Sequence, residues 1–305
     1  MTDPTFVEQT DPDEVFSLLA DETRVEILRA LWADDGEATF SELRAEVGMR
    51  DSGQFNYHLD KLVGRFVTRT DDAYELTQAG MQINGAIAAG AYTAAGSIDP
   101  IELPESCPAC GGERTLHYGD ETVRVACGSC PVEYRVGVPP AVFVGCNRED
   151  VPRVASQYVQ TTFHQLTSGF CAFCDGPATP TVELQFPTGD DGDGSAEASH
   201  DPDSDGISEE SGPVPLARYT CHQCGAEPTL GLPHVFVDHP AVVGFYYDRG
   251  VDVRERSVWA FGATDPGNQS VRGRDPLRVS VTYECEGDTL TLVIDDTVTV
   301  TEIEE

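Results

Sequence analysis

The chain has 305 residues and a formal net charge of −34, with 53 acidic residues against 19 basic ones. This length holds two or three ordinary domains. Forty per cent of the residues are hydrophobic and fall into periodic segments, which excludes a disordered acidic protein.

The acid excess is spread along the whole chain, and arginine outnumbers lysine by 18 to 1. Such a composition favours a halophilic archaeon as the source, because carboxylates hold hydrated cations in molar salt. No stretch approaches the ~18–20 apolar residues of a membrane span, and the acidic N-terminus does not resemble an export signal. We therefore expect a soluble, cytoplasmic protein with no membrane partner and mostly reduced cysteines.

Three predicted helices come first, each with apolar residues at helical spacing. The apolar positions are Val15, Leu18 and Leu19 in the first helix, Val25, Leu28 and Trp32 in the second, and Phe40, Leu43 and Val47 in the third. Thr39 and Glu42 form a capping box at the start of the third helix, and Gly48 ends it.

The next segment, residues 50–69, carries four basic residues and two acidic ones, whereas residues 11–80 as a whole carry 16 acidic and 7 basic residues. This local positive balance indicates a phosphate partner. A fourth helix is predicted here, capped by Asp51 or Ser52, with a buried stripe made of Phe55, Leu59, Leu62 and Phe66. The residues predicted to contact bases or phosphates are Arg50, Ser52, Gln54, Asn56, Tyr57, His58, Lys61, Arg65 and Arg69. His58 is expected on the outward face of the helix, where the alternative to a contact is a helix-packing or solvent role.

A two-stranded hairpin, RFVTRT and AYELT joined at Asp71-Asp72, follows this helix as a wing. At this point residues 11–95 resemble the ArsR-type winged helix-turn-helix regulators, through LADETRVEILRAL, SELRAEVG and NYHLDKL. The resemblance implies sequence-specific binding of double-stranded DNA. Ser52 and Asn56 replace the family's polar pair, so base preference does not transfer. Residues 1–106 contain no cysteine, so the metal sensing of some members does not transfer either.

After the wing, residues 77–96 are rich in alanine and glycine, with Met81, Ile87, Ala88, Ala91, Tyr92 and Ala95 available for one face. This segment either caps the winged helix or brings two copies together. A homodimer is favoured, because paired recognition helices read half-sites ~34–36 Å apart.

Eight of the ten cysteines form four Cys-x-x-Cys pairs. Cys107, Cys110, Cys127 and Cys130 have the spacing of a zinc ribbon, in which four thiolates hold one structural Zn²⁺. Cys171, Cys174, Cys221 and Cys224 form a second set. Its longer spacing is explained by an acidic, disordered insertion at residues 188–216, placed at a hairpin tip.

The two four-cysteine sets indicate a duplicated unit of ribbon, strand and helix, with strands at 138–143 and 232–237. A terminal β-hairpin is predicted in residues 277–305. The predicted class is therefore α+β, with a winged helix at 1–98 and zinc-ribbon units at 99–170 and 171–305.

The remaining reactive residues carry no recognisable chemistry. His117, His164, His234 and His239 lack metalloprotease spacing, and His222 is expected to be exposed rather than a ligand. Cys146 and Cys285 are expected to be buried. No catalytic constellation occurs, so no enzyme activity is predicted.

The predicted function is a DNA-binding transcriptional regulator whose zinc units supply dimerisation, partner contacts or ligand response. One alternative is a protein-interaction module of the transcription machinery, which the acidic charge of residues 11–80 would suit. Another is a metal- or redox-responsive switch, although closed four-thiolate sites are typical of scaffolds.

Overall fold

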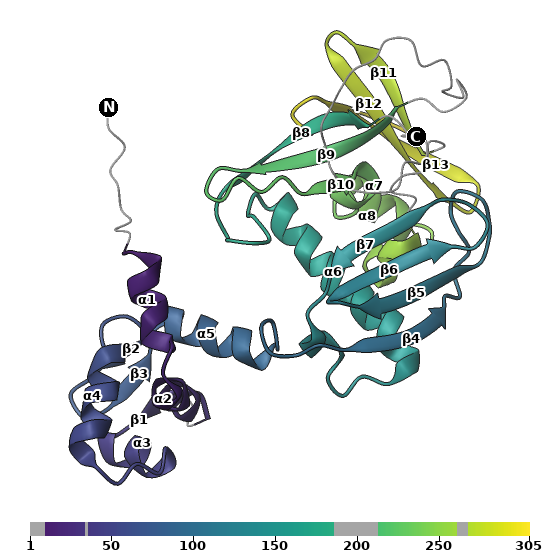
Figure 1. The fold of residues 1–305 in the computed structure, drawn as a ribbon. Helices are drawn as coiled ribbons and strands as arrows, with labels where there is room; N and C mark the ends of the chain where they lie inside the picture. The colour runs from purple at the N-terminus through teal and green to yellow at the C-terminus, as the bar shows by residue number, and fades with distance from the viewer. Residues whose placement is uncertain (1–9, 34–35, 186–212, 261–267) are drawn as a thin grey trace, which may run out of the picture. The chain divides into compact units, whose positions relative to one another are not determined.

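The computed structural model describes residues 10–33, 36–185, 213–260 and 268–305. The chain divides into an N-terminal unit, Met1–Ala94 with Pro139–Ala141, and a C-terminal unit, Ala95–Val138 with Val142–Glu305. Figure 1 shows helices and antiparallel strands in both, in agreement with the α+β prediction. Among the described helices, none has the length and apolar composition needed to cross a bilayer.

The N-terminal unit contains five helices and a small sheet within its described residues. These elements are α1 (Pro12–Leu19), α2 (Glu22–Ala33), β1 (Glu37–Ala38), α3 (Phe40–Glu46), α4 (Ser52–Leu62), β2 (Val67–Arg69), β3 (Tyr74–Leu76) and α5 (Gln78–Ala88). The strand order is β1-β3-β2, and both pairings are antiparallel. The predicted hairpin at residues 65–77 is therefore confirmed.

Side-chain caps set the boundaries of the helices around α4. Thr39 and Glu42 form the predicted capping box of α3. The Asp51 carboxylate accepts a hydrogen bond from the Gln54 backbone N–H at 2.9 Å, which begins α4 at Ser52. The predicted stripe of Phe55, Leu59, Leu62 and Phe66 lies in the core of the unit.

One prediction for α2 is wrong. Trp32 was expected on the inner face of this helix, but it is 52% exposed. Ile27 and Leu31 occupy the core instead, together with the predicted Leu28.

The C-terminal unit begins with a four-stranded antiparallel sheet followed by a long helix. Its first half contains β4 (Ser97–Glu102), β5 (Arg114–Gly119), β6 (Thr122–Cys127), β7 (Glu133–Gly137), η2 (Arg148–Asp150) and α6 (Val151–Thr167). The 3-10 helix η1 (Pro140–Phe143) begins in the N-terminal unit and ends in the C-terminal unit. The strand order is β4-β5-β6-β7.

The second half of this unit contains two further antiparallel sheets. Its elements are β8 (Ala178–Gln185), β9 (Val214–Cys221), β10 (Thr229–Gly231), α7 (Leu232–Val235), α8 (Pro240–Tyr247), η3 (Val253–Glu255), η4 (Val258–Ala260), β11 (Gln269–Arg274), β12 (Leu277–Cys285), β13 (Asp288–Asp295) and β14 (Val300–Glu304). The orders are β10-β9-β8 and β11-β12-β13-β14, so the predicted terminal hairpin is the centre of a larger sheet.

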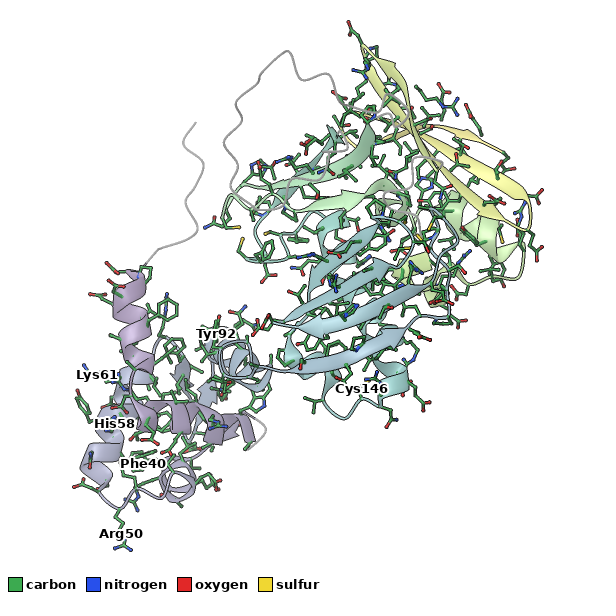
Figure 2. The ribbon with its side chains drawn as sticks, turned by 45° about the vertical axis from the view of Figure 1, so that its right-hand side comes forward. Phe40, Arg50, His58, Lys61, Tyr92 and Cys146 are labelled. Carbon is green, nitrogen blue, oxygen red and sulfur yellow. The ribbon has the colours of Figure 1, made fainter. Side chains whose placement is uncertain are left out.

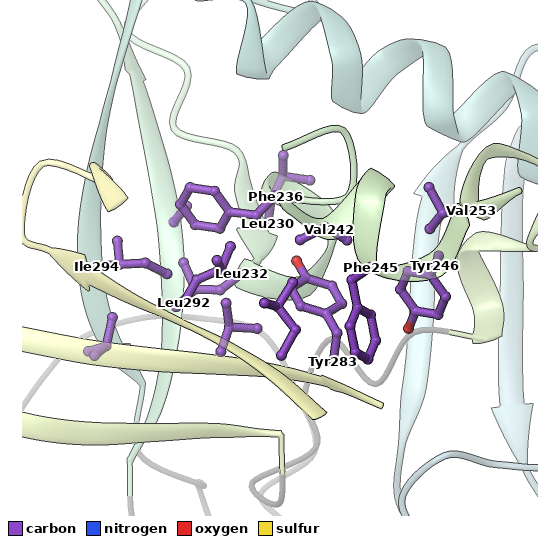
Figure 3. Close-up of a cluster of buried hydrophobic side chains, with 14 of the residues drawn as sticks. Leu230, Leu232, Phe236, Val242, Phe245, Tyr246, Val253, Tyr283, Leu292 and Ile294 are labelled. Carbon is purple, nitrogen blue, oxygen red and sulfur yellow. The ribbon is translucent and has the colours of Figure 1, made fainter. Parts of the chain in front are cut away.

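Two hydrophobic clusters fill the C-terminal unit, and α6 takes part in both. Ala155 and Val159 of α6 pack with the first sheet, whereas Leu166 joins the second cluster. Figure 3 shows this second cluster, where Tyr283 and Leu292 of the last sheet lie against α7 and α8. Both predicted ribbon units therefore lie in one compact unit, and no division between compact units falls at residue 170.

The strands predicted at 138–143 and 232–237 are not strands. Residues 140–143 form the 3-10 helix η1, and residues 232–235 form α7. Proline explains both cases, because Pro140 and Pro233 stand at the first turn of each helix, where the missing N–H has no partner to lose. Of the two lone cysteines, Cys285 is buried as expected, but Cys146 is only half-buried.

Candidate metal centres and nucleic-acid interface

The two predicted four-cysteine sets come together as two separate clusters. In each set, all four sulfur atoms lie within 4.8 Å of one another. The first cluster joins the turn before β5 to the end of β6, and the second joins the turn before β8 to the end of β9. The β5–β6 and β8–β9 hairpins therefore fix the positions of the two clusters, because each hairpin brings two cysteine turns together at one of its ends.

The sulfur separations match a tetrahedral metal site. The Sγ atoms of Cys107 and Cys130 lie 3.7 Å apart, and those of Cys110 and Cys127 lie 3.5 Å apart. The corresponding distances in the second cluster are 3.8 and 3.5 Å. A tetrahedral ion with metal–sulfur bonds of about 2.3 Å requires sulfurs about 3.8 Å apart. Both clusters can therefore hold a metal ion.

Backbone N–H groups are arranged to stabilise thiolates in both clusters. The Ser129 N–H donates to the Cys127 sulfur and lowers the pKa of that thiol to about 7. The N–H groups of Cys224 and Gln223 donate to the Cys221 sulfur and lower its pKa to about 6. Metal binding requires deprotonated thiols, so these donors favour the ligating form of Cys127 and Cys221. Burial and the neighbouring cysteines instead raise the pKa of Cys130 and Cys174 to about 12.

The first turn of each cluster has the same backbone pattern, 64 residues apart. The Cys107 N–H donates to the Gly112 carbonyl at 2.8 Å, and the Cys171 N–H donates to the Gly176 carbonyl at 2.8 Å. Both glycines lie where a Cβ would touch the opposite turn, at 2.7 Å from the Ser129 hydroxyl and 2.6 Å from the Gln223 Cβ. These equivalences support the predicted duplication.

The predicted insertion lies between β8 and β9, whose last and first residues, Gln185 and Val214, pair directly. Residues 188–212 of this insertion lie outside the described residues. Its predicted end at residue 216 is too late, because Leu216 is buried in β9. His222 is exposed as expected, with Nε2 2.7 Å from the Thr179 hydroxyl.

One residue near the first cluster was not predicted. Arg114 is only 1% exposed and lies directly opposite Cys127 in the β5–β6 register. Its Nε donates to the Glu105 carbonyl at 3.2 Å and its Nη1 donates to the Trp259 carbonyl, whereas its Nη2 has no partner among the described residues. Ala178 occupies the equivalent position in the second half. The alternation of buried and less buried residues along β5 could have predicted the burial of Arg114, because Arg114 lies on the same face of the strand as the buried Leu116.

In the N-terminal unit, eight of the nine predicted contact residues are exposed. They are Arg50, Ser52, Gln54, Asn56, Tyr57, Lys61, Arg65 and Arg69. Figure 2 shows Arg50 and Lys61 directed away from the body of the unit. The Lys61 ammonium lies 5.6 Å from the centre of the Tyr57 ring, and the Asn56 amide donates to the Asp60 carboxylate at 2.7 Å.

His58 is the exception, because it is only 8% exposed rather than outward-facing. Its Nδ1 lies 3.2 Å from the carboxylate of Asp21, at the start of α2. The physical reason is its position three residues after Phe55 and four before Leu62, which places it on the buried side of α4. In this structure His58 packs between helices.

Comparison with known families gives two matches, neither with an assigned activity. Residues 104–300 match a domain of unknown function (DUF7351), and residues 12–87 match another (DUF7347). No curated protein matches the chain, and no solved structure matches it. The shorter match falls within the N-terminal unit, and the longer match covers most of the C-terminal unit.

Proposed function

Since the chain belongs to the DUF7351 family, which has no assigned function, we propose a function from its own residues: it binds double-stranded DNA through α4 and regulates transcription. The observation that carries this proposal is the polar face of α4. Gln54, Tyr57 and Lys61 lie on it, and all three are exposed. Their spacing of three and four residues gives one continuous edge, narrow enough for a major groove.

The elements around α4 support a winged helix-turn-helix, the fold that the ArsR-type resemblance implies. Phe40 of α3 packs against Phe55 of α4, with ring centres 5.1 Å apart, which holds the two helices together beneath the polar face. The β2–β3 hairpin follows α4 directly and serves as the wing. Arg65 precedes the hairpin and Arg69 ends β2, and both are exposed for phosphate contacts.

The proposal includes a homodimer, because a regulator of this kind reads two half-sites. Within α5 and the residues after it, Met81 is 42% exposed and Tyr92 is 83% exposed. Large exposed apolar side chains on one segment are typical of an interface. A footprint containing two half-sites about 34–36 Å apart would support the dimer, and a single half-site would contradict it.

We also propose Zn²⁺ as the ion of both clusters. Four cysteine sulfurs at tetrahedral separations select zinc or iron. Two Cys-x-x-Cys turns on adjacent hairpins are the usual framework of structural zinc, which has no open coordination position. In this proposal the metal stabilises the C-terminal unit and takes no part in a reaction.

The test of DNA recognition compares variants on the genomic sites that the protein protects and on scrambled sequences. Gln54→Ala and Asn56→Ala should lower affinity for the protected site by about 1–3 kcal/mol each and leave scrambled DNA unaffected. Arg69→Ala should weaken both probes alike, because phosphates carry no sequence information. Arg29→Ala, an exposed site on α2, is the control. Equal losses on both probes for all three variants would refute base reading.

A protein-interaction module remains the second candidate function, and the wing favours it. Asp71 and Asp72 are exposed at the tip of the hairpin, where a DNA-binding wing would meet phosphate. An acidic tip suits a basic protein surface instead. A purified protein that protects no discrete site, yet co-purifies with RNA polymerase, would favour this function over DNA reading.

A further inference from the structure

A cavity of about 270 Å³ lies within the C-terminal unit, beside α6. Side chains of α6 line one side, and the other side combines α7 and the residues just after it with η3 and η4. An apolar cavity of about 150 Å³ is enough to bind benzene, and pockets for larger ligands hold about 300–1,000 Å³. The space therefore suits a molecule of two fused rings and is small for a nucleotide.

The deep part of the cavity is apolar. Val253 and Val258 line it and are 1% and 4% exposed. Phe163 and Val237 are half-buried, so each leaves part of its apolar surface uncovered. The rings of Phe163 and His234 meet edge to face, with their centres 5.2 Å apart. Burial lowers the pKa of His234, whose Nε2 lies 2.9 Å from the Val258 carbonyl oxygen, so the imidazole is neutral at pH 7.

The charged side chains that line the cavity are already paired within the protein. The Arg254 guanidinium donates to both carboxylate oxygens of Asp252, at 2.9 and 2.8 Å. The Asp238 carboxylate lies 3.6 Å from Nδ1 of His164. An ionic ligand would have to displace one of these partners. Among the described lining residues, no charged group is left without a partner.

The uncharged polar side chains of the lining also have partners. On α6, the Gln157 side-chain oxygen accepts from an arginine of the same helix at 3.2 Å, and the Gln160 amide donates to a backbone carbonyl at 2.9 Å. Thr161 and Thr167 each donate to a carbonyl of the preceding turn of α6, both at 3.1 Å. An ordered water molecule needs about two to four polar partners, which these committed groups supply poorly. The surface that remains for an occupant is therefore apolar.

We propose that this cavity binds an uncharged, apolar molecule with the dimensions of a two-ring aromatic compound. The hydrophobic effect supplies the affinity, because the ligand removes the uncovered surfaces of Phe163 and Val237 from water. The paired lining supplies the selectivity, because a charged ligand would lose its hydration and gain no partner in return. The inference is independent of DNA binding by α4 and adds a small-molecule site to the C-terminal unit.

Isothermal titration of the metal-loaded, full-length protein in molar KCl tests the ligand class. The probe is 4-methylquinoline, which is uncharged at pH 8. The comparison is N-methylquinolinium, which has the same ring system and one methyl group but a fixed positive charge. We expect 4-methylquinoline to bind one molecule per chain and N-methylquinolinium to bind at least about tenfold more weakly, because its charge would be desolvated without compensation.

Molar salt screens the general attraction of a cation to this acidic protein, so the comparison reports on the cavity itself. Equal or tighter binding of N-methylquinolinium would overturn the uncharged ligand class. No binding of 4-methylquinoline would overturn the site.

Variants in the lining show whether the probe occupies this cavity. Val237→Phe fills the space from a half-buried position and should abolish binding. Val243→Phe is the matched control and should bind normally, because Val243 is also half-buried and packs against the same hydrophobic cluster but does not line the cavity. Thr161→Trp, at an exposed lining position, should also block binding without a change in the core. Circular dichroism checks that each variant is folded. Normal binding by folded Thr161→Trp, or equal losses in Val237→Phe and Val243→Phe, would refute the location.

Variants at the mouth test whether charge takes part in recognition. Asp238 and Arg254 have side-chain exposures of 55% and 71%, so Asp238→Asn and Arg254→Gln should leave the fold intact. Both variants should bind 4-methylquinoline as the unmodified protein does, because the proposed recognition is apolar. Loss of binding in either folded variant would show that a mouth charge holds the ligand and would overturn the uncharged class.

Discussion

Arg114 is a buried cation for which the described residues provide no carboxylate partner. Two of its nitrogens donate to the carbonyls of Glu105 and Trp259, and Nη2 has no hydrogen-bond partner in the described part of the chain. An unpaired buried charge costs several kcal/mol, so a nearby anion is expected. Four thiolates around a divalent ion carry a net charge of 2−, and Cys127 is the direct cross-strand neighbour of Arg114. We propose that the first centre, when it holds its metal, supplies this anion for the buried arginine.

We expect Arg114→Met to weaken metal binding at the first centre only. Mutation of a residue that supports the metal ligands typically lowers metal affinity by about 10–100-fold, and we expect a loss in this range. Cobalt substitution followed by competition with a chelator measures the two centres separately. Arg124→Met on β6 is the control, because Arg124 has its own carboxylate, Glu133, at 3.0 Å. Equal weakening of both centres by Arg114→Met would contradict the assignment.

At the scale of single elements, α5 illustrates how close packing fixes a residue type. Its N-cap, Thr77, accepts from the Gly80 N–H at 3.1 Å and donates to the Arg65 carbonyl at 2.7 Å, which ties the helix to the turn between α4 and β2. A Cβ at Gly80 would lie 2.2 Å from the Phe66 carbonyl oxygen. The Phe66 backbone cannot move aside as a flexible side chain would, so this position requires glycine.

Two alanine substitutions in this helix should therefore have opposite signs. Gly80→Ala should destabilise the N-terminal unit by about 1–3 kcal/mol through the forced backbone shift. Gly85→Ala has no atom within 4 Å of its new Cβ and should stabilise the unit by about 0.5–1 kcal/mol, because alanine loses less conformational entropy in a helix. Urea unfolding of both variants measures the difference. Stabilisation by Gly80→Ala would show that α5 packs differently against the hairpin.

Local rules predicted most elements, and the errors share a cause. The caps at Thr39 and Asp51 placed α3 and α4 because a side-chain cap acts within four residues. Trp32 was misplaced because α2 has overlapping apolar stripes, and only tertiary contacts decide which one faces the core. His58 was misplaced for a related reason, since its polarity outweighed its position between Phe55 and Leu62 on the buried side.

The metal centres were predictable from spacing, but their surroundings were not. Cys-x-x-Cys turns are local, whereas Arg114 depends on Trp259, which lies 145 residues away in sequence. The cavity beside α6 likewise forms from segments of both halves, and Phe163 packs against both hydrophobic clusters. The contacts between the two halves also explain why the predicted domain boundary at residue 170 falls inside one compact unit.

At the scale of the whole molecule, the net charge of −34 conflicts with binding a polyanion. Ordinary DNA-binding proteins lose about 10³–10⁵ in affinity between 50 and 200 mM salt as counterion release weakens. Under the proposed DNA binding, we expect this protein to behave differently, on the hypothesis that its carboxylates take up cations at the interface. Its DNA affinity should fall weakly or rise with KCl over the molar range. A steep negative slope in a KCl titration on the protected site would contradict this expectation.

The two compact units have separate hydrophobic cores, and both cysteine clusters belong to the C-terminal unit. Structural zinc contributes about 10–16 kcal/mol in small zinc domains, comparable to the whole stability of a domain. Removing the metal should therefore unfold the C-terminal unit and leave the N-terminal unit folded. Hydrogen exchange of the chelator-treated protein should show lost protection in β5 and β9 and retained protection in α2 and α4. Loss of protection in α2 and α4 as well would mean that the N-terminal core depends on the metal centres for its stability.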